Sequence, residues 1–313
     1  ALVLPLGWLV VDVFRLGGRA LELTVAPQTL EVLARSVALV VVVTAGSVAI
    51  GVPMAMLTAR TTIPLRRFWT VVAALPLAVP SYLGALAAVS AFGPQGTFSA
   101  ALAQFGLGGL PPIQGFFGAA VVLTFYTYPY VFLTTRASLL SLDASLVEAA
   151  RTLNAGRWEA FRRVTLPQIA PGVAAGALLV ALYTLSDFGT PNILRVEVFT
   201  QSIYANYNAF LRDYAALLSL QLLAVTAVIL ALESRIGADD SGAYASRARR
   251  GGVDVHLGGW RYPAMLLPAV VGLVAILLPI VIFATWFVRG GPGYAGGSMA
   301  FSWSYGWHSV YVS

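Results

Sequence analysis

The chain has no cysteine and no lysine, and charged residues make up only 10% of its 313 positions. The lack of cysteine excludes disulfides, cysteine metal sites and thiol chemistry. The lack of lysine excludes a Walker A loop, which places a lysine on the β- and γ-phosphates of ATP. Any ATP-driven work therefore has to come from a partner protein. Soluble domains carry about 25% charged residues, so the composition also argues against a soluble globular domain.

Patterns typical of catalysis and metal binding are missing as well. Neither GxSxG nor HExxH occurs, and the two histidines, His256 and His308, fall in expected loops. Iron held by aspartate or tyrosine would need several hard ligands that converge, and the sequence offers no such cluster. We therefore expect no enzyme, no cofactor and no resident metal.

Apolar sequence is abundant. Of all residues, 58% are hydrophobic, and the mean hydropathy is +0.81. Several runs reach the roughly 20 residues that a helix needs to cross a bilayer. The pattern predicts an all-α, polytopic membrane protein with about seven transmembrane helices. The expected spans are residues 1–14, 33–58, 68–92, 116–139, 170–194, 214–236 and 263–288.

All 19 basic residues are arginines, and their distribution indicates the orientation. Of these, 13 lie on one side of the expected spans, in segments 59–67, 136–163 and 235–261, and 6 lie on the other side. Because cytoplasmic loops carry the excess of positive charge, the first side is expected to be cytoplasmic. The arginines are scattered among short loops without an aromatic reading surface, so nucleic-acid binding is not expected.

Segment 145–172 is polar and rich in arginine, unlike the apolar runs on either side of it. Ser145 and Glu148 fit a capping box at the start of a helix, and Asp143 is an alternative N-cap. Apolar residues then recur with helical spacing, namely Leu146, Ala149, Ala150 and Leu153. Asn154 suits the left-handed conformation that ends such a helix. This stripe is free to contact another protein.

A second short helix is expected directly afterwards. Trp158, Phe161 and Thr165 would share one side of it with Arg162, and Pro167 and Pro171 would stop it before the fifth span. The sequence therefore predicts a helix-turn-helix that lies on the cytoplasmic membrane surface.

The triplet Glu148-Ala149-Ala150, with Val164-Thr165-Leu166-Pro167 downstream, resembles the EAA loop of binding-protein-dependent ABC importer permeases. In that family the loop forms the coupling helices that dock into a groove on a cytoplasmic ATPase subunit. The family usually has glycine at the position of Asn154, and both residues tolerate a positive φ. The resemblance implies an ATPase-coupling loop that includes Glu148, Ala149, Ala150, Leu153, Asn154, Leu166 and Pro167.

The resemblance covers residues 33–236 and implies a multi-pass importer subunit of the bacterial inner membrane. It also implies cytoplasmic ABC ATPase subunits, a periplasmic substrate-binding protein and a second permease unit as partners within the lipid membrane. Two further strings, Ser186-Asp187-Phe188-Gly189-Thr190-Pro191 and Phe199-Thr200-Gln201-Ser202-Ile203-Tyr204, resemble the iron(III)-type branch, whose relatives also carry thiamine and polyamines. Iron(III) is the expected cargo, and thiamine, a polyamine or another small solute is the alternative.

Four polar residues recur with helical spacing near the end of the fifth expected span: Tyr183, Ser186, Asp187 and Thr190. An ionisable residue inside a span is costly and usually faces a cavity or a partner, so this stripe is expected to border the translocation path. Alternatively, Asp187 lies at the outer interface, where it caps a helix end or pairs with Arg195. Thr124, Thr127 and Tyr128 either line the same cavity or bond to neighbouring helices, and the second interpretation is favoured.

The strings LPLGWLVVDVFRLGG at 4–18 and LPIVIFATWFVRGG at 278–291 are similar, and Pro5 and Pro279 are 274 positions apart. Chance similarity is the alternative to a repeat in so apolar a sequence. The expected layout is a permease unit at 1–236, a cytoplasmic linker at 237–262 and the first span and outer segment of a second, incomplete unit at 263–313. The unit has its transmembrane core at 33–236 and its EAA loop at 140–169. The native chain is expected to continue past Ser313.

Two other classes remain as alternatives. A secondary transporter would couple an ion through membrane carboxylates or broken helices. Only Asp187 qualifies as such a carboxylate, and the EAA loop would be unexplained. A structural membrane protein would have no use for the polar stripe.

Overall fold

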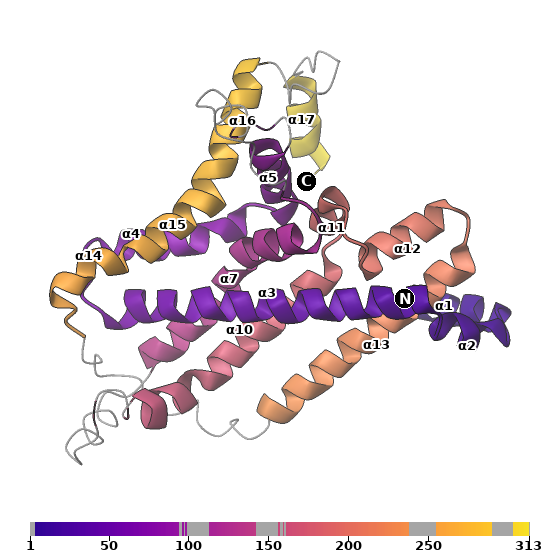
Figure 1. The fold of residues 1–313 in the computed structure, drawn as a ribbon, viewed down its shortest axis with the longest axis horizontal. Helices are drawn as coiled ribbons and strands as arrows, with labels where there is room; N and C mark the ends of the chain where they lie inside the picture. The colour runs from indigo at the N-terminus through magenta and orange to yellow at the C-terminus, as the bar shows by residue number, and fades with distance from the viewer. Residues whose placement is uncertain are drawn as a thin grey trace.

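The structure, a computed structural model, describes residues 4–93, 96, 98, 113–141, 156, 159, 161–237, 255–289 and 303–312. Apart from an isolated bridge between Thr61 and Val255, regular structure in these residues is helical (Figure 1). The expected all-α class is therefore confirmed. The longest helices are α3 (Pro27–Arg60), α7 (Gly115–Ser141), α10 (Leu166–Ser186) and α13 (Arg212–Gly237).

Five described helical stretches are long and apolar enough to cross a membrane, and a bent pair would make a sixth. About seven spans were expected, and the described residues contain five or six of them. The five stretches are Pro27–Arg60, Gly115–Ser141, Phe161–Ser186, Arg212–Leu232 and Gly258–Val288.

The first expected span begins in residues that the structure does not describe. From Leu4 on it forms α1 (Leu4–Arg15), followed by the short α2 (Arg19–Thr24). The helix α1 packs against α13. An apolar run of this length does not reveal whether its helix spans the bilayer or lies along a neighbour.

The third expected span, residues 68–92, is broken. Helix α4 (Arg66–Ala74) and the 3₁₀ turn η1 (Leu75–Ala78) meet α5 (Ser81–Phe92) at an angle of 93°. The bend follows from Pro80, because the residue before a proline is pushed out of the helical region. Val79 accordingly has the extended torsions φ −106° and ψ 121°.

The core of the molecule is the three-helix contact of α3, α7 and α10 (Figure 1). A Cβ atom at Gly176 of α10 would lie 2.6 Å from the Cα of Val131 in α7, and one at Gly51 of α3 would lie 3.0 Å from the backbone nitrogen of Phe132. Small residues at these crossings let the helix backbones approach closely, which is how membrane helices gain packing energy. Glycine at these two positions therefore allows the short distances from α10 and α3 to α7.

The last span belongs to the segment expected to begin a second unit. It comprises η4 (Gly258–Trp260), α14 (Arg261–Ala264), α15 (Leu266–Gly272), the π turn η5 (Leu273–Leu277) and α16 (Leu278–Arg289). It packs on the bent pair, where Ile282 is buried with Ala87 and Ala91. The hydroxyl of Tyr126 donates to the carbonyl of Ala275 at 3.0 Å, within the π turn. The span thus lies against α5 and α7.

The two similar strings form similar helices. Helix α1 (LPLGWLVVDVFR) and helix α16 (LPIVIFATWFVR) each have 12 residues, begin at leucine and end at arginine. The C-terminal helix α17 (Trp303–Val312) follows α16 after a segment outside the described residues. The division into a linker and a second unit remains a prediction, since residues 238–254 also lie outside the described ranges.

Candidate functional site

A cavity of about 430 Å³ lies between α7, α10 and α13. Four of its eight lining residues are leucines, and the other four carry hydroxyl groups. These four are Tyr130, Tyr183, Ser186 and Thr226. Two of them, Tyr183 and Ser186, are residues that the sequence assigns to the translocation path. The cavity therefore offers neutral hydrogen-bonding groups on a largely apolar surface.

Tyr183 links this cavity to the broken span. Its hydroxyl donates to Oγ of Ser81, the first residue of α5, at 3.0 Å. Its ring lies 6.0 Å from that of Tyr130, measured between centroids. A change in the bend between α4 and α5 would therefore move a side chain of the cavity wall.

The expected polar stripe is not one continuous helical face. Helix α10 ends at Ser186, and Asp187 has the extended torsions φ −71° and ψ 121°. The short helix α11 (Gly189–Leu194) then follows, and Thr190 is fully buried in it. The sequence missed this break because helical spacing continues across it without any proline or glycine before Gly189. Only Tyr183 and Ser186 line the cavity.

Asp187 bridges the two helices. One carboxylate oxygen accepts from the backbone N–H of Thr190 at 3.2 Å, and its backbone carbonyl accepts from the hydroxyl of Thr200 at 2.9 Å. A carboxylate in this position stabilises a helix start by satisfying a free N–H group. The geometry therefore gives Asp187 the capping role that the sequence left as an alternative. It is half-buried next to Ser186, so its charge is also near the cavity.

Thr127 and Tyr128 form hydrogen bonds to neighbouring helices, which is the interpretation that the sequence analysis favours over lining the cavity. Oγ1 of Thr127 lies 3.0 Å from Oγ of Ser47 in α3, and the hydroxyl of Tyr128 donates to the carbonyl of Ala73 in α4 at 2.7 Å. Both side chains are fully buried. These groups hold the helix bundle together, and neither lines the cavity.

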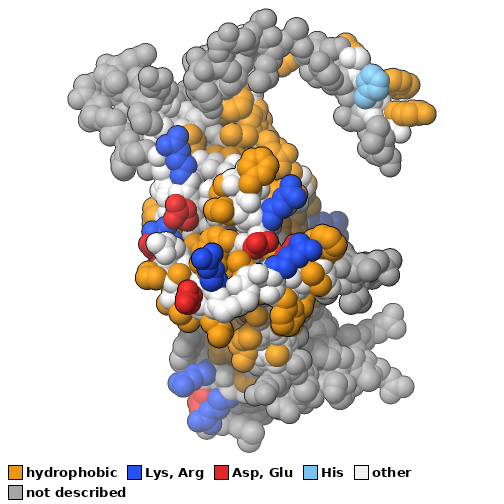
Figure 2. All heavy atoms as spheres, turned by 90° about the vertical axis from the view of Figure 1, so that its right-hand side faces the viewer, with side chains coloured by type: hydrophobic (Ala, Val, Ile, Leu, Met, Phe, Trp, Pro, Cys, Tyr) orange, Lys and Arg blue, Asp and Glu red, His pale blue; other side chains and the backbone are white. Residues whose placement is uncertain are grey.

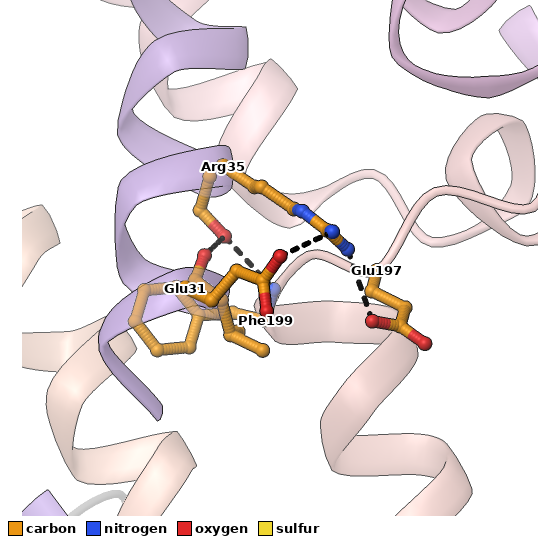
Figure 3. Close-up of polar contacts among 6 residues, drawn as sticks. Glu31, Arg35, Glu197 and Phe199 are labelled. Atoms are coloured by element: carbon orange, nitrogen blue, oxygen red, sulfur yellow. Dashed lines mark hydrogen bonds and ion pairs between the residues drawn. The ribbon is translucent and has the colours of Figure 1, made fainter. Parts of the chain in front are cut away.

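An ion cluster near the start of α3 was not identified from the sequence. Arg35 of α3 pairs with Glu31 one turn earlier, and its Nη1 lies 3.0 Å from Oε2 of Glu197 (Figure 3). Beside it, Oγ of Ser36 accepts from the backbone N–H of Phe199, which begins α12 (Phe199–Asn208). The Glu31–Arg35 spacing of four residues was the only available signal. Glu197 is distant in sequence, so the fold had to bring it there.

This cluster fixes the connection between α11 and α12 onto the start of α3. The ion pairs are exposed, so each contributes little to stability, whereas the hydrogen bond to Ser36 is buried. Figure 2 shows acidic and basic side chains interspersed with hydrophobic ones on this face. The arrangement holds the segment that carries Asp187 and Thr200 in place.

The expected coupling loop lies largely outside the described residues, which resume at residue 161 apart from two single positions. Glu148, Ala149, Ala150, Leu153 and Asn154 all fall in the segment that is not described. Leu166 and Pro167 are described, and both are exposed at the start of α10. The loop's role remains a prediction from the sequence.

The two prolines do not stop a helix here, contrary to the expectation. A π turn at Phe161–Thr165 leads directly into α10, so the helical stretch is continuous to Ser186. Pro167 occupies the first turn of α10, where no N–H partner is needed, and Pro171 lies within the helix. Neighbouring helices and water can satisfy a carbonyl freed by a membrane proline.

Arginines from separate elements meet at one end of the bundle. Nη2 of Arg60, the last residue of α3, donates to the carbonyl of Leu139 near the end of α7. Arg66 donates to the carbonyls of Thr58 and Ala59. Helix α10 starts at the same end, since its Gly172 lies against Ser138 of α7. The segments expected on the cytoplasmic side are therefore together in space.

The family model described as binding-protein-dependent transport system inner membrane component matches residues 47–237 of this chain. The match covers more than half of the chain, including α7, α10, the cavity and the expected coupling loop.

Individual relatives transport different substrates. The Fe(3+)-transport system permease protein FbpB 2 of Haemophilus influenzae is 29% identical over 231 residues, which cover 73% of this chain and 42% of that relative. The sulfate transport system permease protein CysT of Escherichia coli is 29% identical, covering 60% of this chain and 70% of the relative. The molybdenum transport system permease protein ModB of Mycobacterium tuberculosis is 31% identical, covering 58% and 70%.

A solved structure shares the fold. A chain of the bacterial alginate ABC transporter, crystallised with an alginate pentasaccharide-bound periplasmic protein, superposes with a TM-score of 0.57 at 19% identity. The match covers 75% of this chain and 88% of the other. The chain spans less than half the length of the iron(III) relative. Taken together, the helical membrane fold and the family match show that this chain is a multi-pass inner-membrane protein that belongs to the binding-protein-dependent transport system permeases of ABC importers.

Proposed function

We propose that the chain forms the translocation path of an importer whose substrate is delivered by an extracytoplasmic binding protein. A separate ATPase subunit would drive transport. These residues contain no lysine and therefore cannot bind ATP through a Walker A loop. The observation that carries this proposal is the family match over residues 47–237, which contains both the cavity and the EAA-like loop. The alginate transporter that shares the fold was solved with a periplasmic protein bound, which supports a periplasmic binding protein as a partner of this chain.

ATP-driven uptake tests this function directly. The purified chain, its ATPase and its binding protein would be reconstituted in proteoliposomes with labelled substrate outside and ATP inside. Uptake should require ATP and the binding protein and should persist without any ion gradient. Uptake driven by an ion gradient in the absence of ATP would favour the secondary-transporter alternative instead.

A second permease unit would complete the path, on this chain or on another copy. The matching helices α1 and α16 support a repeat of the unit. The cavity between α7, α10 and α13 would then form part of a wall that faces the second unit. Polar hydroxyls on that wall are costly to expose to lipid, which favours a protein or water-filled surface opposite them.

Iron(III) is the substrate that we favour. The strings at 186–191 and 199–204 support it, and so does the similarity to an iron(III) permease over 231 residues. Sulfate and molybdate permeases are about as similar in percentage identity, so an oxyanion is the second candidate. In the reconstituted system, labelled iron(III) uptake should be unaffected by excess sulfate, molybdate, thiamine or spermidine. Inhibition by one of these would identify it as the competing substrate.

Asp187→Asn separates the charge of this residue from its capping role. An asparagine oxygen can still accept from the N–H of Thr190, so thermal stability should stay near that of the wild type. Loss of the negative charge should lower uptake of a cationic substrate several-fold and weaken its dependence on ionic strength. Initial uptake rates at low and high salt provide the measurement.

Asp187→Ala is the matched control, because it removes both charge and cap. It should additionally destabilise the protein by about 1 kcal/mol, the usual value of a helix cap. An Asp187→Asn variant with wild-type rate and salt dependence would leave Asp187 as a helix cap alone.

A further inference from the structure

Three of the four hydroxyl groups in the cavity wall already donate their protons to other protein groups. Oγ of Ser186 donates to the backbone carbonyl of Tyr183 at 3.0 Å, and Oγ1 of Thr226 donates to that of Leu222 at 2.8 Å. The hydroxyl of Tyr183 donates to Oγ of Ser81 at 3.0 Å. A hydroxyl group has one proton but two lone pairs. These three groups therefore face a bound molecule as hydrogen-bond acceptors.

The fourth hydroxyl, that of Tyr130 in α7, makes no hydrogen bond with the residues that the structure describes. The ring of Tyr130 lies against that of Tyr183, and its backbone carbonyl accepts from Oγ1 of Thr134. The side chain is half-buried and lines the cavity. Because no described protein group fixes this hydroxyl, it can turn its lone pairs toward a bound molecule. The sequence analysis did not assign Tyr130 to the translocation path.

The charge of the wall disfavours an anion. None of the eight described residues that line the cavity is charged, and the half-buried Asp187 follows directly after Ser186. An oxyanion such as sulfate or molybdate is held by several N–H or O–H donors, preferably on cations. This wall offers it one free donor, on Tyr130, and leaves it opposite three acceptors, which is unfavourable. The wall therefore suits a ligand that presents donors and positive charge.

A bare multivalent cation does not suit this wall either. Moving an ion out of water into an apolar site is very costly, and a few neutral hydroxyl groups do not replace its hydration. The cavity volume of about 430 Å³ leaves another route. Six water molecules occupy about 180 Å³, at roughly 30 Å³ each. A cation can therefore enter with a complete first shell, whose outward O–H groups donate to the acceptors of the wall.

We propose that this cavity takes a cation together with its shell of water. Tyr183, Ser186 and Thr226 accept hydrogen bonds from the shell, and Tyr130 is the residue that tunes the affinity. The inference rests on the proposed importer function and narrows its substrate to a hydrated cation, which excludes the oxyanions.

Hexaamminecobalt(III) is a suitable probe for this site. Its six ammine ligands do not exchange, and their N–H groups point outward as donors, as the O–H groups of a water shell do. The full chain would be reconstituted in phosphatidylcholine nanodiscs, without ATPase or binding protein, and bound cobalt measured by equilibrium dialysis. The wild type should bind the complex saturably, and excess sulfate or molybdate at constant ionic strength should not displace it. Displacement by either oxyanion would overturn the proposal.

Tyr130→Phe should weaken this binding by about tenfold, the usual effect of losing one hydrogen bond to a charged group. Its thermal stability should equal that of the wild type, because the hydroxyl holds no other described part of the protein. Tyr204→Phe is the matched control. Tyr204 is exposed on α12, outside the cavity, and its hydroxyl makes no hydrogen bond with the described residues. This variant should bind the probe as the wild type does.

Equal binding by Tyr130→Phe and the wild type would overturn the role of Tyr130. If Tyr130→Phe does not fold, Thr226→Val replaces it, since valine keeps the shape of threonine and removes one acceptor of the wall. Binding should fall by a similar factor, and unchanged binding would count against the site.

Uptake assays separate this inference from the function on which it rests. In the reconstituted importer, ATP-driven uptake of sulfate or molybdate would overturn the hydrated cation while confirming the importer function. Uptake of no substrate in the presence of ATP, ATPase and binding protein would overturn the importer function itself. Iron(III) uptake with a KM that rises about tenfold in Tyr130→Phe, at an unchanged rate of ATP hydrolysis, would support both.

Discussion

A Gly176→Leu substitution is expected to abolish correct assembly of the transmembrane core. Its Cβ alone would lie 2.4 Å from Oγ1 of Thr134 and 2.6 Å from Cα of Val131. A backbone atom cannot rotate away, so α10 would have to separate from α7. Overpacking typically costs 1–3 kcal/mol, and we expect about 3 kcal/mol or more here. Size-exclusion chromatography of the detergent extract and thermal unfolding provide the measurement.

Gly7→Leu is the matched control for this prediction. Gly7 is also inside an apolar helix, α1, but no atom lies within 4 Å of a Cβ built there. The same change of residue should therefore leave yield and thermal stability close to the wild type. A Gly176→Leu protein as stable as Gly7→Leu would show that α7 and α10 do not approach as closely as described.

An Ala150→Arg substitution is expected to abolish association with the ATPase and ATP-driven uptake. The prediction rests on the sequence, where Ala150 belongs to the apolar stripe of the EAA-like loop. Placing an unpaired guanidinium group into an apolar contact costs several kcal/mol, enough to weaken binding by about a hundredfold or more. Co-purification of the ATPase with the tagged chain measures the loss.

Thr152→Arg adds the same charge to the same segment away from the stripe, so the ATPase should still co-purify. Both variants should insert into the membrane and show wild-type thermal stability, since neither residue belongs to a span. An Ala150→Arg complex that stays intact and active would refute the assignment of this stripe to ATPase docking.

Membrane class and family could be predicted from the sequence because their signals are local. A span needs only a long apolar run, and orientation needs only a count of arginines. The EAA-like triplet and its downstream Leu166-Pro167 are likewise contiguous strings. The family match and the helical structure confirm the family and the membrane class, whereas the orientation and the EAA-like loop stay predictions. The substrate could not be predicted as firmly, since relatives with similar identity transport iron, sulfate and molybdenum.

The absence of lysine also allows a conclusion from the sequence alone. Without lysine these 313 residues cannot form a Walker A loop however they fold, so this conclusion needs no structure. The small-residue contacts at Gly51 and Gly176, by contrast, could not be distinguished from those of the other 28 glycines without knowing which helices cross.

The sequence by itself determined that this chain is a helical membrane protein of the importer permease family, because apolar length, arginine bias and short motifs are properties of adjacent residues. Only the tertiary structure decided where helices end and what they touch. The break after Ser186 makes Asp187 a bridge between two helices, and the bend at Pro80 turns one expected span into two pieces. The Arg35–Glu197 pair and the hydrogen bond from Tyr128 to Ala73 join residues far apart in the chain. Such contacts depend on how whole helices pack, which no local pattern encodes.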